Sequence, residues 1–320
     1  MRYTNGVRAA FRILFSLFVA IVPSFSCQGR QRSVALTFDD LPIAGTNDPA
    51  IAQSVNGRIL DALERHHAPA VGFVIGRGAQ ELGDVGTAIL TAWGKRGQML
   101  GNHTFSHNVS DALTTEQFQK DIEGGGVSLA AVLPKTYSGS RYFRFPQNHT
   151  GDTKEKHDAI AAFLTERGYR VAPCTIDNED FVFNSAYLKM LPNRDGASAT
   201  KLRAAYLAYT AVEIDYYAGL HKQIFGREPP QVMLLHVNQL NADVIDKLID
   251  LFKSRHYRFV TLDMALNDAA YKTPDIFIVK FAKSGPMWGY RWAEALHVRV
   301  HGSLEAEPPE WVMEYQTKQK

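Results

Sequence analysis

Two short polar groups in this sequence are of the types that hold metal ions and move protons. Asp39 and Asp40 end the apolar run Val34–Phe38, and His103 and His107 stand four residues apart. On a helical turn that spacing puts both imidazoles on one side, where they can bind one ion. Taken separately, each group is more often structural, because Asp is a favoured turn residue and most histidine pairs lie on surfaces or in satisfied cores.

Combined, Asp40, His103 and His107 make a two-histidine, one-carboxylate set with open positions for water and substrate. Zinc is the first metal that this set predicts, and Co²⁺, Ni²⁺, Mn²⁺ or Fe²⁺ would accept the same ligands. Successive side chains of a regular strand point to opposite faces, so Asp39 and Asp40 can serve one site only if the backbone turns there. The following Leu41-Pro42 favours such a turn.

The elements that must position these residues alternate between strands and helices. Apolar runs predict strands at 34–38, 70–75, 98–101, 142–145, 170–176, 232–235 and 258–262. Apolar spacing and capping signals predict helices at 50–63, 87–95, 114–133, 153–167, 202–224 and 242–254. We expect Gly124–Gly126 to break or bend the third helix, and 184–201 to be an insertion. The alternation predicts an α/β fold, a seven-stranded, possibly incomplete parallel β/α barrel.

In such barrels the active site gathers at the carboxyl ends of the strands. Five strands deliver polar side chains to that rim, namely Asp39, Asp40, His103, Arg144, Asp177, Asp180 and His236. Chance placement explains this set poorly. For single members the structural alternatives stay open: Arg144 could form a structural salt bridge and Asp180 could cap a helix or turn.

The N-terminus has the pattern of a secretory signal. Arg2, Arg8 and Arg12 precede the ten-residue apolar run Ile13–Val22, which is short of the roughly 20 residues of a membrane-spanning helix. We therefore expect a signal peptide at 1–26 and an exported protein, periplasmic, in the cell envelope or extracellular. The 35 basic and 33 acidic residues leave a net charge of +2, with no nucleic-acid footprint.

The chain has two cysteines, Cys27 and Cys174, which are too few for a disulfide framework. Cys27 would be the first mature residue, so membrane anchoring follows only if it is lipidated. Ser24 stands where a lipoprotein signal usually has leucine. Cys174 is expected to be a buried thiol.

Five ordered motifs resemble those of the polysaccharide deacetylase family, the NodB-homology fold of carbohydrate esterase family four. They are Thr37-Phe38-Asp39-Asp40, His103-Thr104-Phe105-Ser106-His107, Arg144-Phe145-Pro146, Asp177-Asn178-Glu179-Asp180-Phe181 and Leu234-Leu235-His236. The resemblance covers about 33–266, which we expect to be the deacetylase domain, with 267–320 as a C-terminal extension.

The resemblance implies a role for each matched residue. Asp39 would be the general base, and Asp40, His103 and His107 would hold the metal. His236 would be the general acid, Arg144 would orient Asp39, and Asp180 would tune His236. Leu234 would line the pocket for the acetyl methyl.

Two substrate-facing positions depart from the family pattern. Gln147 replaces the usual aromatic residue after the proline of the third motif, and Phe181 replaces the usual tryptophan of the fourth. A backbone N–H at Gln147 is unchanged by the replacement, whereas the wall it presents to a sugar is different. Both changes bear on sugar specificity more than on catalysis.

The sequence favours an exported metal-dependent hydrolase that removes N-acetyl groups from an N-acetylglucosamine polymer, such as peptidoglycan or a chitin-like chain. An esterase for O-acetylated xylan would need the same motifs, since both reactions pass through a tetrahedral intermediate. A non-catalytic glycan-binding module is the alternative from another class. The aromatic tail, Pro286–Trp292 with Trp311, could bury its aromatic side chains against the barrel or offer them as a platform for sugar rings. Of these two roles, burial against the barrel is the more frequent one for such a tail.

Overall fold

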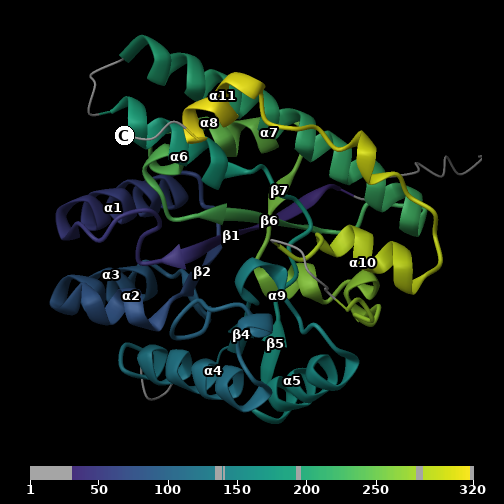
Figure 1. The fold of residues 1–320 in the computed structure, drawn as a ribbon. Coiled ribbons are helices and arrows are strands. Elements are labelled where there is room, and N and C mark those ends of the chain that lie inside the picture. The colour runs from purple at the N-terminus through teal and green to yellow at the C-terminus, as the bar shows by residue number, and fades with distance from the viewer. Residues whose placement is uncertain (1–30, 134–138, 140, 192–195, 279–283, 318–320) are drawn as a thin grey trace, which may run out of the picture. The chain divides into compact units, whose positions relative to one another are not determined.

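Parallel strands form the centre of the fold (Figure 1). The computed structural model describes residues 31–133, 139, 141–191, 196–278 and 284–317, which belong to one structural unit. The strands are β1 (Ser33–Leu41), β2 (Ala70–Val74), β3 (Met99–Asn102), β4 (Arg141–Phe143), β5 (Tyr169–Val171), β6 (Gln231–His236) and β7 (Arg258–Phe259). The predicted seven-stranded parallel α/β sheet is confirmed.

The strand order is β5-β4-β3-β2-β1-β6, and β7 also pairs with β1. Strand β1 lies at the centre and is buried along almost its whole length, as its apolar sequence predicts. The predicted strand 170–176 is shorter than expected, because β5 ends at Val171. Ile176 nevertheless makes a parallel bridge to Met233 of β6, so the segment after β5 reaches toward the far edge of the sheet without closing it as a continuous strand.

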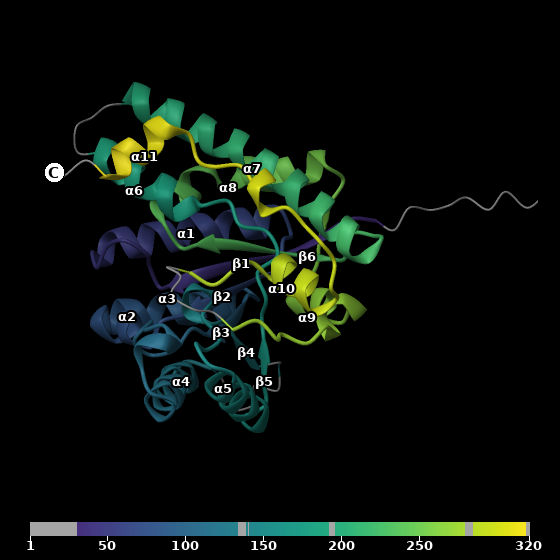
Figure 2. The ribbon, with the colours of Figure 1, turned by 45° about the vertical axis from the view of Figure 1, so that its right-hand side comes forward.

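Helices surround the strands of the sheet (Figure 1). They are α1 (Pro49–Arg65), α2 (Gly76–Glu81), α3 (Gly83–Lys95), α4 (Thr115–Ala130), α5 (Lys154–Glu166), α6 (Asp180–Met190), α7 (Gly196–Phe225), α8 (Gln239–Ser254), α9 (Leu262–Leu266), α10 (Trp288–Ala295) and α11 (Glu310–Thr317). In both ribbon views α4 and α5 lie beside β4 and β5, whereas α6, α7 and α8 lie on the side of β1 and β6 (Figure 2).

The local sequence signals that set the helix starts act as expected. Asp48 accepts hydrogen bonds from the backbone N–H groups of Ala50 and Ile51 at the start of α1. Thr114 and Gln117 form the predicted capping box at the start of α4, with both reciprocal hydrogen bonds present. These caps fix the N-terminal ends of α1 and α4.

The prediction that Gly124–Gly126 break or bend the third helix is wrong, because α4 runs unbroken from Thr115 to Ala130. The glycines serve a close contact instead. A Cβ at Gly125 would lie 2.2 Å from Oδ1 of Asn102 and 2.8 Å from the carbonyl carbon of Thr104. The absence of side chains therefore lets α4 press against the loop that follows β3.

Two further regions differ from a simple alternation. The expected insertion 184–201 is largely helical, since it contains most of α6 and the start of α7. The segment after Asn267 packs on the rest of the unit: α10 contacts α7, and α11 contacts α6. Trp292 is 1% exposed and Trp288 is 6% exposed, so these tail aromatics are buried against the fold.

The N-terminal predictions, namely the signal peptide and the state of Cys27, lie outside the described residues. Within the described ranges, no helix has the length and apolar character needed to span a membrane. Cys174 is free and buried, as expected.

Candidate active site and metal centre

Asp40, His103 and His107 lie together at the carboxyl ends of β1 and β3. Oδ1 of Asp40 is 3.3 Å from Nε2 of His107 and 3.7 Å from Nε2 of His103, and the three donor atoms all lie within 4.8 Å of one another. Ligands that share a tetrahedral zinc ion at about 2.0–2.1 Å are roughly 3.3–3.5 Å apart. The spacing therefore fits one divalent cation.

The chemistry of the donors also fits a cation. Oδ1 of Asp40 is buried and makes no hydrogen bond, so it is an acceptor without a donor. His103 is 2% exposed and its Nδ1 lies 2.9 Å from the carbonyl oxygen of Arg144. Nδ1 donates in that bond, which leaves the Nε2 lone pair free for a metal. Burial and the neighbouring His107 lower the pKa of His103 to about 3, so the ring is neutral as a ligand must be.

The backbone turns that aim these ligands are strained. Asp40, Thr104 and His107 all have φ between 59° and 65°, in the left-handed region that non-glycine residues rarely adopt. The register between β1 and β2 shifts between Phe38 and Leu41, so a bulge interrupts the strand at the two carboxylates. This irregularity, rather than a turn after Leu41 alone, brings adjacent aspartates to one site.

Asn102 holds the loop that carries both histidines. Its Oδ1 accepts from the Thr104 backbone N–H at 2.9 Å, and its Nδ2 donates to the carbonyl oxygen of Ile122 in α4 at 2.8 Å. The Thr104 hydroxyl in turn accepts from the His107 backbone N–H at 2.9 Å. The left-handed turn at His107 is thus fixed by hydrogen bonds that reach back to α4.

Asp39 faces the same space but has a different partner. Nη1 of Arg144 donates to Oδ1 of Asp39 at 3.0 Å and to the Thr37 hydroxyl at 2.8 Å, and both Asp39 and Arg144 are buried. The other oxygen, Oδ2, lies 3.7 Å from Nε2 of His103. Burial raises the pKa of Asp39, and Arg144 opposes part of that rise. The result is a buried carboxylate with one oxygen held and the other directed at the metal ligands.

His236 and Asp180 form the other polar pair of the site. Nδ1 of His236 lies 2.6 Å from Oδ1 of Asp180, which is 0% exposed, and the His236 backbone N–H donates to Oδ2 of Asp180 at 2.8 Å. Burial alone would lower the pKa of His236, but Asp180 reverses this and the pKa rises to about 10. The ring is therefore an imidazolium at neutral pH, with Nε2 left free.

A cavity of about 770 Å³ joins these groups, and eight of the ten predicted site residues line it: Asp39, Asp40, His103, His107, Gln147, Phe181, Leu234 and His236. The other two, Arg144 and Asp180, are fully buried behind Asp39 and His236, which they contact. All ten predicted positions thus meet in one place.

Sequence reasoning missed several residues of this cavity. Ser284, Gly285, Pro286, Met287, Tyr290 and Glu305 reach it from the C-terminal segment. The backbone N–H of Gly285 donates to the carbonyl oxygen of Gln147 at 2.8 Å, and Arg291, which is 0% exposed, donates to the carbonyl oxygen of Asn148 and to Thr150. The tail is therefore bound to the loop after β4. The buried aromatics could be anticipated, but nothing local in the sequence marked Glu305 for the site.

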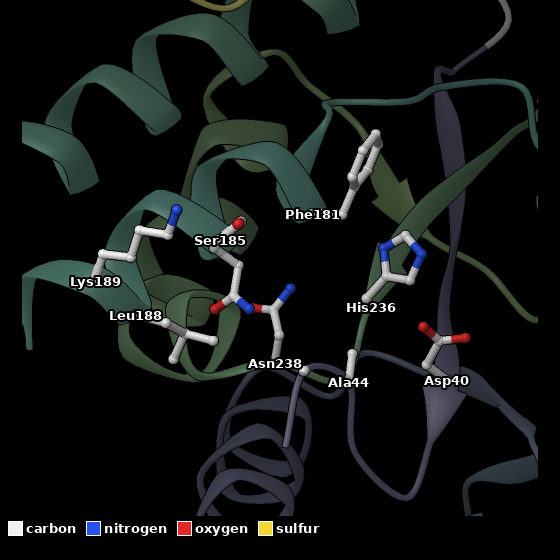
Figure 3. A pocket seen from close by; sticks show the side chains of 10 residues that line it. Asp40, Ala44, Phe181, Ser185, Leu188, Lys189, His236 and Asn238 are labelled. Atoms are coloured by element: carbon white, nitrogen blue, oxygen red, sulfur yellow. The ribbon is translucent and has the colours of Figure 1, made fainter. Parts of the chain in front are cut away.

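A second, smaller pocket of about 420 Å³ is also lined by His236. Figure 3 shows Phe181, His236 and Asp40 on one side of it, with Ser185, Lys189 and Asn238 on the other. The two pockets share Asp40, Phe181 and His236. These three residues thus border both pockets, whereas Asp39, His103 and His107 line only the larger one.

Residues 27–168 match the family model described as polysaccharide deacetylase. The chain is also 24% identical over 248 residues to a peptidoglycan N-acetylglucosamine deacetylase of Bacillus cereus, over 75% of this chain and 70% of that protein. Residues 27–168, 142 of the 320 residues, carry the match to the polysaccharide deacetylase family. The matched region includes Asp39, both histidines and Arg144, whereas Asp180 and His236 lie beyond it.

Solved structures described as a polysaccharide deacetylase and as a member of carbohydrate esterase family 4 have a similar fold. A polysaccharide deacetylase of Bacillus cereus superposes with a TM-score of 0.52 at 19% identity, covering 72% of this chain and 92% of that one. A pseudoenzyme of carbohydrate esterase family 4 from Bacillus anthracis superposes with a TM-score of 0.51 at 15% identity, covering 74% and 66%. One solved structure with this fold is thus described as a pseudoenzyme, so the fold alone does not decide activity.

Proposed function

We propose that this protein is an exported, metal-dependent hydrolase that removes N-acetyl groups from an N-acetylglucosamine-containing polysaccharide, either peptidoglycan or a chitin-like chain. One observation carries the proposal: a cation-ligand set, a buried carboxylate and an imidazolium surround a single cavity. The likeness to a peptidoglycan N-acetylglucosamine deacetylase supports this polymer class. A divalent cation, most simply Zn²⁺, would be held by Asp40, His103 and His107.

When bound, the cation would supply a positive charge for the oxygen of the acyl group and for the water that attacks it. Asp39 would take the proton of that water as general base. Its raised pKa makes it a stronger base than an exposed aspartate, and Arg144 holds its carboxylate in one orientation. Asp39 lies next to Asp40 in the sequence, so the proton acceptor is kept beside the ligand set.

His236 would donate a proton to the nitrogen that leaves. The amine is a poor leaving group unless it is protonated, and Asp180 keeps the imidazole charged for this step. Because Nδ1 is occupied by Asp180, the proton must leave from Nε2. Asp39 and His236 are paired residues on the neighbouring strands β1 and β6, which fixes the distance between base and acid.

The substrate-facing residues would define the two ends of the scissile group. Leu234, which is buried and lines the cavity, would contact the acetyl methyl. The ring of Phe181, which is 49% exposed, would offer an apolar surface to a sugar in place of a tryptophan. Gln147 would present a polar wall, and its φ of 50° turns the chain there.

The remaining parts of the proposal concern the whole chain. Residues 1–26 would act as a signal peptide, 33–266 would be the catalytic domain and 267–320 an extension that completes the pocket. The mature protein would be periplasmic, in the cell envelope or extracellular. Membrane anchoring through Cys27 would follow only from lipidation.

Measuring acetate release separates this function from its rivals. The purified protein, loaded with Zn²⁺, should release acetate from N-acetylglucosamine oligomers and little from O-acetylated xylan. The Asp39→Asn variant should lose turnover but still bind one metal ion per chain. Acetate from xylan alone would favour the esterase, and oligomer binding without acetate from either substrate would favour a non-catalytic glycan-binding module.

A further inference from the structure

One wall of the main cavity is acidic. Asp177 and Glu179 come from the loop before α6, and Glu305 comes from the C-terminal segment. All three carboxylates are partly exposed to the cavity. The described residues that line the cavity include no lysine or arginine. The wall therefore presents three acidic side chains to whatever enters beside the candidate site.

Glu305 is held in place rather than free to turn toward solvent. The hydroxyl of Tyr290 donates to Oε2 of Glu305 at 2.6 Å, and the hydroxyl of Tyr217 donates to Oε1. Tyr217 belongs to α7 and Tyr290 to α10, so two helices fix one carboxylate. Two neutral hydroxyl donors orient the carboxylate but leave its charge in place.

Glu213 lies behind this wall and has no counter-charge. It is 1% exposed, and neither of its carboxylate oxygens makes a hydrogen bond of ordinary geometry. Burial and the nearby Glu305 raise the pKa of Glu213 to about 8, which the backbone of Ala306 offsets only in part. Burial and Asp177 likewise raise the pKa of Glu179 to about 8. Both groups are therefore mostly protonated at neutral pH, because an ionised carboxylate without a counter-charge is costly there. A cation bound at the cavity wall would favour the ionised form of Glu179, which lines the cavity.

The spacing of these carboxylates does not suit a metal ion. Among the described residues, the one set of three or more ligand atoms within 4.8 Å of one another is Asp40, His103 and His107. The acidic wall spreads its oxygens too widely for three of them to share an ion without movement. An organic ammonium group, which has three hydrogen-bond donors and a diffuse attraction to several carboxylates, fits better.

We propose that the acidic wall formed by Asp177, Glu179 and Glu305, with Glu213 behind it, binds the ammonium group of a glucosamine unit next to the unit being deacetylated. The inference rests on the proposed function, because deacetylation is what creates such ammonium groups. A partly deacetylated chain would then be bound more tightly than a fully acetylated one. The second pocket, which contains Asn184, Ser185 and Asn238 but no acidic residue apart from the shared Asp40, would take a neutral unit.

The test is calorimetric binding in the metal-loaded Asp39→Asn background, which prevents turnover. A fully deacetylated glucosamine tetramer should bind more tightly than the N-acetylglucosamine tetramer. Glu305→Gln or Glu179→Gln should each weaken the glucosamine tetramer by roughly five- to tenfold, since each removes a charge-assisted hydrogen bond. Neither change should weaken the acetylated tetramer. Glu310→Gln, which removes an exposed charge elsewhere on the tail, is the matched control and should change neither affinity.

Equal affinity for both tetramers, or equal effects of Glu305→Gln and Glu310→Gln, would overturn the proposal. If Ca²⁺ competed with the glucosamine tetramer and this competition disappeared in Glu305→Gln, the wall would be a metal site instead of an ammonium site. Lys280 and Lys283 lie outside the described residues, and a large gain in glucosamine binding by the K280Q/K283Q variant would show that the chain supplies the cation itself. Failure of the wild type to release acetate would refute the proposed function alone, because these binding results do not depend on turnover.

Discussion

Replacing Asp180 by asparagine should move the alkaline limit of activity by several pH units. Burial lowers the pKa of His236, but Asp180, with smaller contributions from Asp40 and Asp39, raises it to about 10. Without the Asp180 carboxylate the pKa should fall to the ordinary value of about 6.5 or below. Asparagine keeps the size of the side chain and can still accept a hydrogen bond from Nδ1, so the position of the ring is largely preserved.

The size of the effect follows from the fraction of charged rings. With a pKa of about 6.5, roughly three quarters of the rings carry the proton at pH 6 and about 3% at pH 8. In the wild type nearly all rings carry it at both values. The activity of Asp180→Asn relative to wild type should therefore fall about 25-fold between pH 6 and pH 8.

The assay is kcat/KM for acetate release from an N-acetylglucosamine oligomer between pH 5.5 and 10.5. Asp177→Asn is the matched control, because it makes the same change three residues earlier on a side chain that makes no hydrogen bond to His236. Its alkaline limit should stay near that of the wild type. A uniform loss in Asp180→Asn at all pH values would refute the argument, since it would mean that Asp180 positions the ring without setting its charge.

Three further changes test the supports of the site. Gly125→Ala places a Cβ 2.2 Å from Oδ1 of Asn102, so we expect the loop that carries His103 and His107 to shift. Urea unfolding should then show a stability loss of about 1–3 kcal/mol, and Zn²⁺ should bind more weakly. Gly57→Ala, where a Cβ meets nothing within 4 Å, is the control and should leave the stability unchanged or raise it. Equal stability losses in the two variants would count against the close contact between Gly125 and Asn102. Arg144→Lys should lower the stability by about 3 kcal/mol and remove most of the activity, because lysine cannot make the three buried hydrogen bonds to Ala172, Thr37 and Asp39. Arg170→Lys, at a partly exposed position, should change stability and activity little. Chelation should abolish acetate release and added Zn²⁺ should restore it; full activity in the chelated, metal-depleted protein would exclude a metal role.

Much of the site could be predicted because its signals are local. The apolar run of β1 predicted a buried strand, and the ends of parallel strands meet at one rim, which brings Asp40, His103 and His236 together. The helix cap at Thr114 was equally local.

The rest depended on contacts between distant segments. Helix propensity alone predicts a break at Gly125, but the need for close packing against Asn102 decides its role. Glu305 enters the cavity because Tyr217 and Tyr290 orient it, and these partners are 88 and 15 residues away in the chain. No periodicity or spacing rule reports such a contact.

Because the C-terminal segment forms part of the cavity, the cavity is completed only when the last part of the chain has been synthesised. Ribosomes build the chain from the N-terminus, so Asp39, His236 and the three candidate cation ligands are all synthesised before Glu305. A chain that is clipped before Ser284 would keep these side chains, but it would lose one wall of the cavity together with Trp288, Trp292 and Val312, which are buried in the core. Trimming this end is therefore expected to lower the stability of the fold and to open the cavity at the same time.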